Sequence, residues 1–234
     1  YTTAGIAKTN EEMNEHLKTN RPSWGDNWQA GDIMYKDLNG DETVNGGANT
    51  LSDHGDLRRL GYNAPRFKVG FNADLTWQGL DFSFFLQGVG RRDWFDNSPY
   101  SVGATSHGQW QSVGFKEHWD FFRPEGDPNG ANLNARYPRP LFEKGAKNMQ
   151  TQSRYVVNAA YLRIKNIQLG YTLPASLTKK IGVSRLRVYT SADNLVTFTK
   201  LPKIFDPEAT GGDWGPGKIY PLQRVISCGL NVNI

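Results

Sequence analysis

From Phe67 onward, apolar and polar residues alternate over runs of about ten residues, the pattern of a β-strand with one apolar face. The first run ends at Trp77, and the second begins at Leu80 after a tight turn made by Gln78 and Gly79. Apolar residues on the shared face are Val69, Phe71, Ala73, Leu75 and Trp77, followed by Leu80, Phe82, Phe84 and Leu86. The two runs therefore predict a hairpin of two long strands.

Three further strands are expected in the last third of the chain, where the alternation returns. The apolar positions are Ile167, Leu169, Tyr171 and Leu173 in the third strand, Leu186, Val188 and Ala192 in the fourth, and Ile226, Cys228, Leu230, Val232 and Ile234 in the last. Leu162 and Ile164 are out of phase with Ile167, which predicts a β-bulge between them. A compact turn over 173–182 separates the third strand from the fourth.

The connections are short at one end of these strands and long at the other. Those after Trp77 and Leu173 are short, whereas the segments before Phe67, over 90–157 and over 199–221 are long. Strands of ~9–11 residues with this asymmetry are typical of outer-membrane barrels, whose short turns face the periplasm. We therefore expect an all-β fold that supplies the C-terminal strands of a large transmembrane antiparallel β-barrel with long extracellular loops, and a periplasmic C-terminus.

The expected organisation has two parts. Residues 1–66 form an extracellular loop region with a short helix over 9–19 and an acidic turn, and residues 67–234 form the barrel segment. The start at Tyr1 has neither the basic nor the apolar part of a signal peptide, so the chain is either cytoplasmic or an internal fragment of an exported protein. The strand pattern favours the fragment. Five strands cannot close a barrel in lipid, so further strands must come from elsewhere.

A soluble extracellular β-sandwich that binds carbohydrate is the alternative, because its strands also alternate apolar and polar residues. The two readings differ in what the apolar faces contact. In a barrel the strand residues Val69, Phe71 and Leu75 meet lipid, whereas in a sandwich they meet a second sheet.

Several other classes of function are disfavoured by composition. The net charge of +4 is spread along the chain without a Lys/Arg block, which argues against nucleic-acid binding. Cys228 is the only cysteine, and the four histidines are scattered, so a zinc site is not expected. The chain has no G-x-S-x-G motif, and no spacing singles out a catalytic pair of carboxylates. We therefore expect no enzymatic activity.

One candidate metal site is the acidic segment that contains Asp37, Asn39, Asp41 and Thr43 at alternate positions. This spacing is the opening half of a calcium loop, since a hard cation takes six or more oxygen ligands. The twelfth position is Ala48, so no glutamate closes the loop. Calcium is therefore the candidate cofactor. The alternative is a polar turn in which Asp and Asn side chains bind their own backbone.

Aromatic residues are concentrated in the long connection over 90–157. They are Trp94, Phe95, Tyr100, Trp110, Trp119, Phe121 and Phe122. Aromatic faces beside polar side chains suit recognition of sugars or of a partner protein. Trp94, Tyr100, Trp110 and Trp119 are the candidates for contact with cargo or partner. The alternative is that they pack the loop against itself.

A set of sequence blocks resembles the SusC/RagA family of TonB-dependent transporters, and the blocks occur in the order that the family has. They are Gly-Asp-Ile-Met-Tyr-Lys-Asp-Leu-Asn-Gly-Asp (31–41), Asn-Ala-Pro-Arg-Phe (63–67), Gly-Phe-Asn (70–72), Phe-Phe-Leu-Gln-Gly (84–88), Glu-His-Trp (117–119), Ala-Arg-Tyr-Pro-Arg (135–139), the run from Ala160 to Pro174, Leu-Arg-Val-Tyr (186–189), Asp-Asn-Leu (193–195) and Phe-Asp-Pro-Glu (205–208). The resemblance covers residue 28 to the end. It aligns Asp56 with a later aspartate of the family, which implies that Asp56 closes the acidic metal loop after an insertion at 45–55. Two departures are Glu42, where the family has glycine, and the terminal Ile234, where an aromatic residue is usual.

The resemblance implies a plugged outer-membrane barrel of about 22 strands. It also implies import of oligosaccharides or peptides, energised through the TonB system by an N-terminal part of the protein. The implied partners are a SusD-like surface lipoprotein, the remaining barrel and plug of the same transporter, and outer-membrane lipid.

Overall fold

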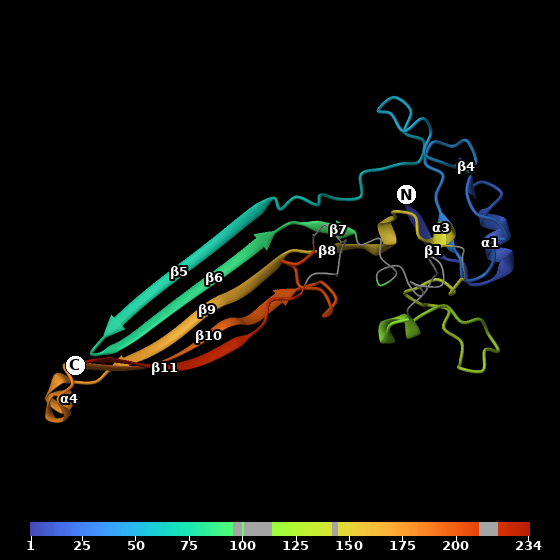
Figure 1. Ribbon diagram of the computed structural model, residues 1–234. Coiled ribbons are helices and arrows are strands. Elements are labelled where there is room, and N and C mark those ends of the chain that lie inside the picture. The colour runs from blue at the N-terminus through green and yellow to red at the C-terminus, as the bar shows by residue number, and fades with distance from the viewer. Residues whose placement is uncertain (96–99, 101–113, 142–144, 211–219) are drawn as a thin grey trace. The chain divides into compact units, whose positions relative to one another are not determined.

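The computed structural model describes residues 1–95, 100, 114–141, 145–210 and 220–234 (Figure 1). The chain divides into two compact units. The first comprises Tyr1–Gly61 with Trp94–Val156, and the second comprises Tyr62–Asp93 with Val157–Ile234. The expected division at residue 66 differs from this one, because most of the long connection joins the N-terminal segment in one unit. No helix among the described residues has both the length and the apolar character needed to cross a membrane.

The second unit is built on one antiparallel sheet of five strands (Figure 1). Its strands are β5 (Phe67–Trp77), β6 (Leu80–Gly90), β9 (Tyr161–Thr172), β10 (Arg185–Thr199) and β11 (Val225–Asn233). The spatial order is β11-β10-β9-β6-β5. The five expected strands and the expected pairing of the last strand with the fourth are confirmed.

The two short connections lie at the same end of this sheet. Gln78 and Gly79 both have positive φ, of 48° and 87°, as a two-residue hairpin turn of type I′ requires. The other connection contains α4 (Ala175–Thr178) and η3 (Lys179–Ile181), and Gly182 ends it in the left-handed conformation. The backbone N–H of Ser184 donates to the carbonyl of Asn233 at 2.8 Å. The chain therefore ends beside the short turns, as expected.

The expected bulge lies in β9 at Lys165. Phe85 of β6 is opposite Asn166, but the next residue, Leu86, is opposite Ile164. Lys165 is thus the extra residue, and the side chains before and after it return to the same faces of the sheet. This explains why the alternation of the sequence changes phase between Ile164 and Asn166.

The first unit consists of short elements around small apolar clusters. The strand pairs are β1 (Thr3–Ile6) with β3 (Ile33–Tyr35), antiparallel, and β2 (Arg21–Pro22) with β4 (Thr43–Val44), parallel. The remaining elements of this unit are α1 (Asn10–His16), η1 (Lys116–Trp119), α3 (Gly145–Asn148) and η2 (Ser153–Tyr155). Strands β7 (Asp93–Phe95) and β8 (Val156–Asn158) pair where the chain passes from one unit to the other. Helix α1 is shorter than expected, and the Thr9 side chain caps it by accepting from Glu12 N at 3.1 Å.

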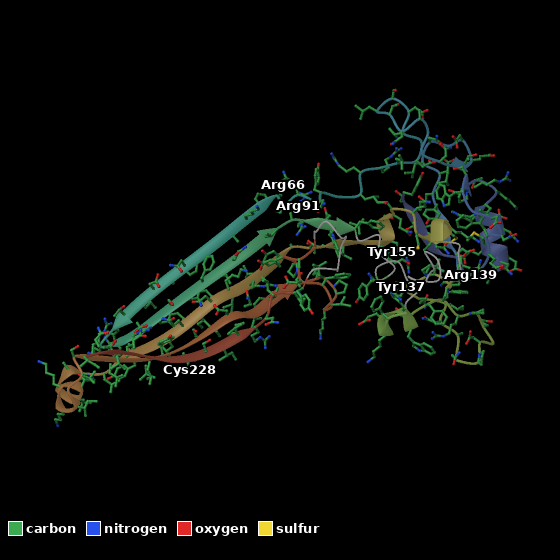
Figure 2. All side chains as sticks on the ribbon, viewed as in Figure 1. Arg66, Arg91, Tyr137, Arg139, Tyr155 and Cys228 are labelled. Atoms are coloured by element: carbon green, nitrogen blue, oxygen red, sulfur yellow. The ribbon has the colours of Figure 1, made fainter. Side chains whose placement is uncertain are left out.

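The core of the first unit joins segments that are far apart in the sequence. Ile33, Tyr35 and Phe122 are buried in one cluster, with Trp24 and Trp28 packed against it. In a neighbouring cluster, Tyr137 and Tyr155 stack with ring centroids 6.2 Å apart (Figure 2). These contacts tie the N-terminal segment and the long connection into one body.

A buried carboxylate, Asp32, lies among these clusters. It accepts from Arg139 Nε at 2.9 Å and Nη2 at 3.1 Å, and Lys147 Nζ lies 2.9 Å from it. Asn148 and the backbone of Gln29 complete its hydrogen bonds at 3.0 Å each. Burial lowers the pKa of Lys147, and the bond to Asp32 offsets part of that effect. Both cations contact this carboxylate, so the buried negative charge is compensated by its neighbours.

Candidate functional site

One face of the five-stranded sheet is apolar from edge to edge. The pairing register places on this face the residues Val69, Phe71, Leu75 and Trp77 of β5, Leu80, Phe82, Phe84 and Leu86 of β6, Leu162, Ile164, Ile167, Leu169 and Tyr171 of β9, Leu186, Val188, Val196 and Phe198 of β10, and Ile226, Cys228, Leu230 and Val232 of β11. Many of these side chains are exposed, for example Leu75 at 64% and Leu230 at 65%.

No second layer covers this face among the described residues of the second unit. The β-sandwich alternative requires a second sheet there, because its strands bury their apolar side chains between two sheets. The described part of that unit holds the single five-stranded sheet. A contiguous apolar surface of this extent marks contact with a partner or with lipid.

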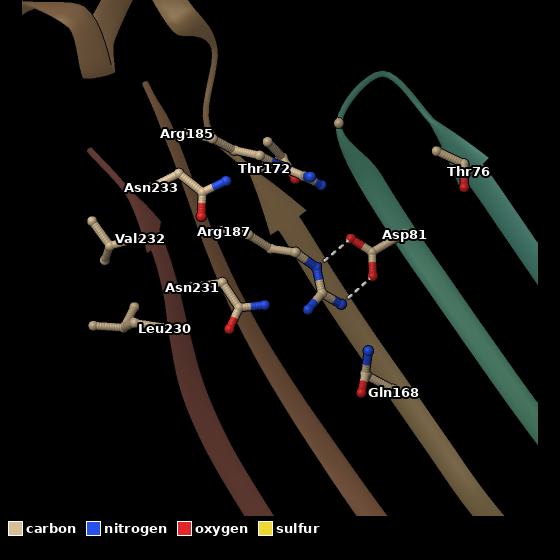
Figure 3. A pocket seen from close by; sticks show the side chains of 11 residues that line it. Thr76, Asp81, Gln168, Thr172, Arg185, Arg187, Leu230, Asn231, Val232 and Asn233 are labelled. Atoms are coloured by element: carbon tan, nitrogen blue, oxygen red, sulfur yellow. Dashed lines mark hydrogen bonds and ion pairs between the residues drawn. The ribbon is translucent and has the colours of Figure 1, made fainter. Parts of the chain in front are cut away.

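The opposite face of the sheet is polar. Near the short turns it carries an ion pair between β6 and β10. Arg187 Nε donates to Asp81 Oδ1 at 2.9 Å, and a second bond joins Nη2 to Oδ2 (Figure 3). The pair passes over Gly170 of the intervening strand, where a Cβ atom would lie 2.5 Å from Asp81 Oδ2. A side chain at this position would force the Asp81 carboxylate and the Arg187 guanidinium to move, so the ion pair in this geometry relies on glycine.

A second glycine serves the same layer of side chains. The Arg187 guanidinium lies over the Tyr189 ring, with Cζ 4.9 Å from the ring centroid. Tyr189 in turn covers Gly229 of β11, where a Cβ atom would lie 2.5 Å from the tyrosine Oη. Beside this layer is a polar pocket of about 820 Å³, whose lining includes Arg185, Gln168, Asn231 and Asn233 (Figure 3).

At the other end of the polar face, Arg163 anchors the long connection that follows β10. Its Nε donates to Thr197 Oγ1 at 2.7 Å, and its Nη2 donates to Asp206 at 2.8 Å. Glu208 lies 2.7 Å from Arg163 Nη1 and 2.8 Å from Lys165 Nζ. These ion pairs hold the Phe-Asp-Pro-Glu segment against the sheet.

The carboxyl of Asp206 is held in its ionised form. Burial alone would raise its pKa, but bonds from the backbone of Glu208, from Arg163 and from the backbone of Leu222 outweigh burial, so the pKa lies below its usual value. Asp206 therefore keeps the charge with which it binds Arg163.

In the acidic loop of the first unit, the side-chain oxygens bind the loop's own backbone. Asp37 Oδ1 accepts from Asn39 N and Gly40 N, and its Oδ2 accepts from Glu42 N at 2.8 Å. Asp41 Oδ1 accepts from Thr43 N at 2.8 Å. Burial acts to raise the pKa of Asp37, but the bonds from Gly40, Glu42 and Asn39 outweigh it and lower the pKa. These contacts are those of the polar-turn alternative.

Asp56 reaches this loop, as expected from the sequence, but it is fully buried there. It accepts from Leu38 N at 2.6 Å and from Asn45 N at 2.8 Å. Over the described part of the chain, no three His, Cys, Asp or Glu residues gather in a way that could hold a metal ion. Calcium at Asp37, Asn39, Asp41, Thr43 and Asp56 stays a prediction, and most of the oxygens that it needs already accept hydrogen bonds.

Glu42, where the resembling family has glycine, adopts a positive φ of 64°. This conformation costs a residue with a Cβ atom ~1–2 kcal/mol, and glycine avoids most of that cost. Glycine also adds freedom to the unfolded chain, so we expect Glu42→Gly to stabilise the unit by up to about 1 kcal/mol. Thermal unfolding measures the change. Glu42→Ala is the matched control, because it removes the carboxylate but keeps the Cβ, and equal stabilisation by both variants would contradict the backbone explanation.

The four aromatic candidates for cargo or partner contact separate in the structure. Trp94 and Tyr100 are buried, as expected if these aromatic residues pack the loop against itself. Burial raises the pKa of Tyr100 to about 12. Trp119 is exposed, and Arg123 lies over its ring at 5.3 Å. Trp110 lies outside the described residues. Trp119 is thus the candidate whose ring is open to a ligand or partner.

The known proteins that this chain resembles are consistent with a sheet that has one apolar and one polar face. No protein-family model matches the chain. TonB-dependent receptor P3 of Formosa agariphila is 29% identical over 221 residues, which cover 89% of this chain and 19% of the receptor. TonB-dependent receptor P26 of the same organism is 28% identical over 87% of this chain and 20% of its own length. The chain thus spans about a fifth of the length of these curated relatives.

Solved structures give a similar result. A structure of the RagAB peptide transporter is 27% identical and superposes with a TM-score of 0.56, over 74% of this chain and 17% of the matched chain. The RagAB peptide importer in its open-open state superposes over 100% of this chain and 22% of the matched chain with a TM-score of 0.60. Its identity is 22%, so this second likeness shows the fold alone.

Proposed function

We propose that this chain, which is homologous to TonB-dependent receptors and matches the RagAB transporter in structure, forms wall strands and loops of an outer-membrane nutrient importer. The observation that carries the proposal is the apolar face that runs across all five strands while the opposite face is polar. In a barrel wall, the apolar face contacts lipid and the polar face lines the interior.

The dimensions of the sheet support this assignment. β5 and β6 have 11 residues each, and at ~3.4 Å per residue each strand is about 37 Å long. A strand tilted by ~45° then rises about 26 Å, close to the ~25 Å apolar band of outer-membrane barrels. Trp77 lies at the hairpin end of β5, where an interfacial aromatic residue belongs.

The edges of the sheet require partners in hydrocarbon, because each unpaired backbone group there costs several kcal/mol. In the proposed barrel, β5 and β11 pair with strands from the rest of the transporter. The short turns and the C-terminus face the periplasm, and the long connections face the cell exterior.

The proposed role of the whole protein is transport and not catalysis. RagAB is described as a peptide transporter, so a peptide is one candidate cargo and an oligosaccharide is the other. A SusD-like surface lipoprotein is the proposed partner over the outer opening, while the plug and the TonB-contacting segment belong to the remainder of the transporter.

Cys228 provides a direct test of the lipid-facing side. It is the only cysteine of the chain and is exposed on the apolar face of β11 (Figure 2). In full-length transporter otherwise free of cysteine, a fluorophore on Cys228 should be quenched strongly by brominated lipid, because its position contacts acyl chains. The matched control combines Cys228→Ser with Ser227→Cys, which moves the fluorophore to the polar face. Equal quenching at the two positions would rule out the proposed orientation.

A further inference from the structure

A second pocket lies on the polar face of the sheet, at the end where the long connections begin. The proposed function as a barrel wall gives no role to the residues that line it. Its volume is about 510 Å³, within the ~300–1,000 Å³ typical of ligand sites. Polar and charged side chains of the lining come from three strands and two connections: Lys68 of β5, Gln87 of β6, Tyr161 of β9, Arg92 and Glu208. All of them belong to the second unit.

The charge of this pocket is positive. Glu208 lines it, but its two oxygens are already paired with Arg163 and Lys165 at 2.7 and 2.8 Å. Arg92 donates from Nε to the carbonyl of Asn63 and from Nη1 to the carbonyl of Pro207, each at 3.1 Å, so both recorded acceptors are neutral. Lys68 is exposed, and no ion pair of its ammonium group is found among the described residues.

Two neutral groups add directional donors to the same pocket. Gln87 Nε2 donates to the Tyr161 hydroxyl oxygen at 3.3 Å, so the proton of that hydroxyl is available to another acceptor. Tyr161 is buried, and its aromatic ring provides a wall beside the cations. A planar anion with two acceptor oxygens fits this set of donors better than a neutral ligand does.

We propose that this pocket binds a carboxylate group of the imported molecule, through Lys68, Arg92 and the Tyr161 hydroxyl. The proposal rests on the proposed transport function, because it takes the polar face to line the path of the cargo. The same chemistry is offered by an acidic peptide and by an oligosaccharide that contains uronic acid. The pocket therefore favours acidic cargo over its neutral counterpart.

Binding to full-length transporter in detergent tests the proposal with two pairs of probes. One pair is a C-terminally amidated tripeptide of two glutamates and a glycine with its glutamine counterpart, and the other is trigalacturonate with its methyl ester. We expect at least one acidic probe to bind about tenfold more tightly than its neutral counterpart, and Lys68→Gln to remove about that factor. The pair that shows the difference identifies the source of the carboxylate.

The controls separate charge in the pocket from charge elsewhere. Lys180→Gln removes an exposed lysine at the opposite end of the sheet, so it should change the affinity for neither the acidic nor the neutral probe. Lys68→Arg keeps the positive charge and should retain the preference for the acidic probe. Absence of a preference in both pairs, or an equal loss of acidic and neutral binding in Lys68→Gln, would overturn the inference. The quenching of the Cys228 fluorophore is independent of these measurements, so a failure here leaves the proposed function standing.

Discussion

Replacing Asp32 with asparagine should destabilise the first unit by about 3–5 kcal/mol, the cost of removing one partner from a buried ion pair. The carboxylate is fully buried and is paired with Arg139 and Lys147 at 2.9 Å each. Asparagine keeps the size of the side chain but leaves both cations without their counter-charge. Arg139 and Lys147 follow Asp32 by 107 and 115 positions in the sequence. Loss of these contacts should therefore loosen the whole unit and not only β3.

Amide hydrogen exchange measures this effect locally in full-length transporter. We expect protection of the paired amides of β1 and β3 to fall by two or more orders of magnitude in Asp32→Asn, as a change of ~3 kcal/mol implies. Glu125→Gln is the matched control, because this carboxylate of the same unit is exposed. Unchanged protection in Asp32→Asn would show that the buried pair does not hold the unit together.

Arginine in place of Leu230 should cost about 2–4 kcal/mol if the position lies near the bilayer midplane, and less toward either interface. Leu230 projects from the centre of β11 into the apolar face, where it is opposite Val188 of β10. A charged side chain there must leave water for hydrocarbon or distort the bilayer locally. The measured quantity is the free energy of unfolding in lipid bilayers.

The control for Leu230→Arg lies three residues away on the same strand. Ser227→Arg adds the same side chain to the polar face of β11, where it can stay in contact with water, so we expect it to change the free energy of unfolding by much less. Equal destabilisation by the two arginines would contradict a lipid-facing assignment and would favour a layer of protein over both faces.

The second unit could be predicted from the sequence because its information is local. A period of two assigns each residue of β5 and β6 to a face, and a change of phase marks the bulge at Lys165. The sequence blocks that resemble the SusC/RagA family, in the same order as in that family, then indicated the class of protein. The ion pair between Asp81 and Arg187 was not predicted, although the alternation places both on the polar face, because strand register between distant segments leaves no periodic signal.

The first unit could not be predicted in the same way. Its strands have two to four residues, too short to show a period. Asp32 and Arg139 lie within blocks that the resemblance singled out, yet nothing in either block indicates that they meet. The aromatic candidates show the same limit, since composition alone does not separate a buried Trp94 from an exposed Trp119.

The two glycines beneath the polar layer also bear on how the strands find their alignment. Side chains on the apolar face are nearly interchangeable, so a slip of β10 by two residues would leave that face apolar. On the polar side such a slip would move Tyr189 away from its partners Gly170 and Gly229 to positions opposite residues with a Cβ atom. It would also displace Arg187 from its position across Gly170 from Asp81. The polar face thus distinguishes the native alignment from its nearest competitors, whereas the apolar face would tolerate the slip.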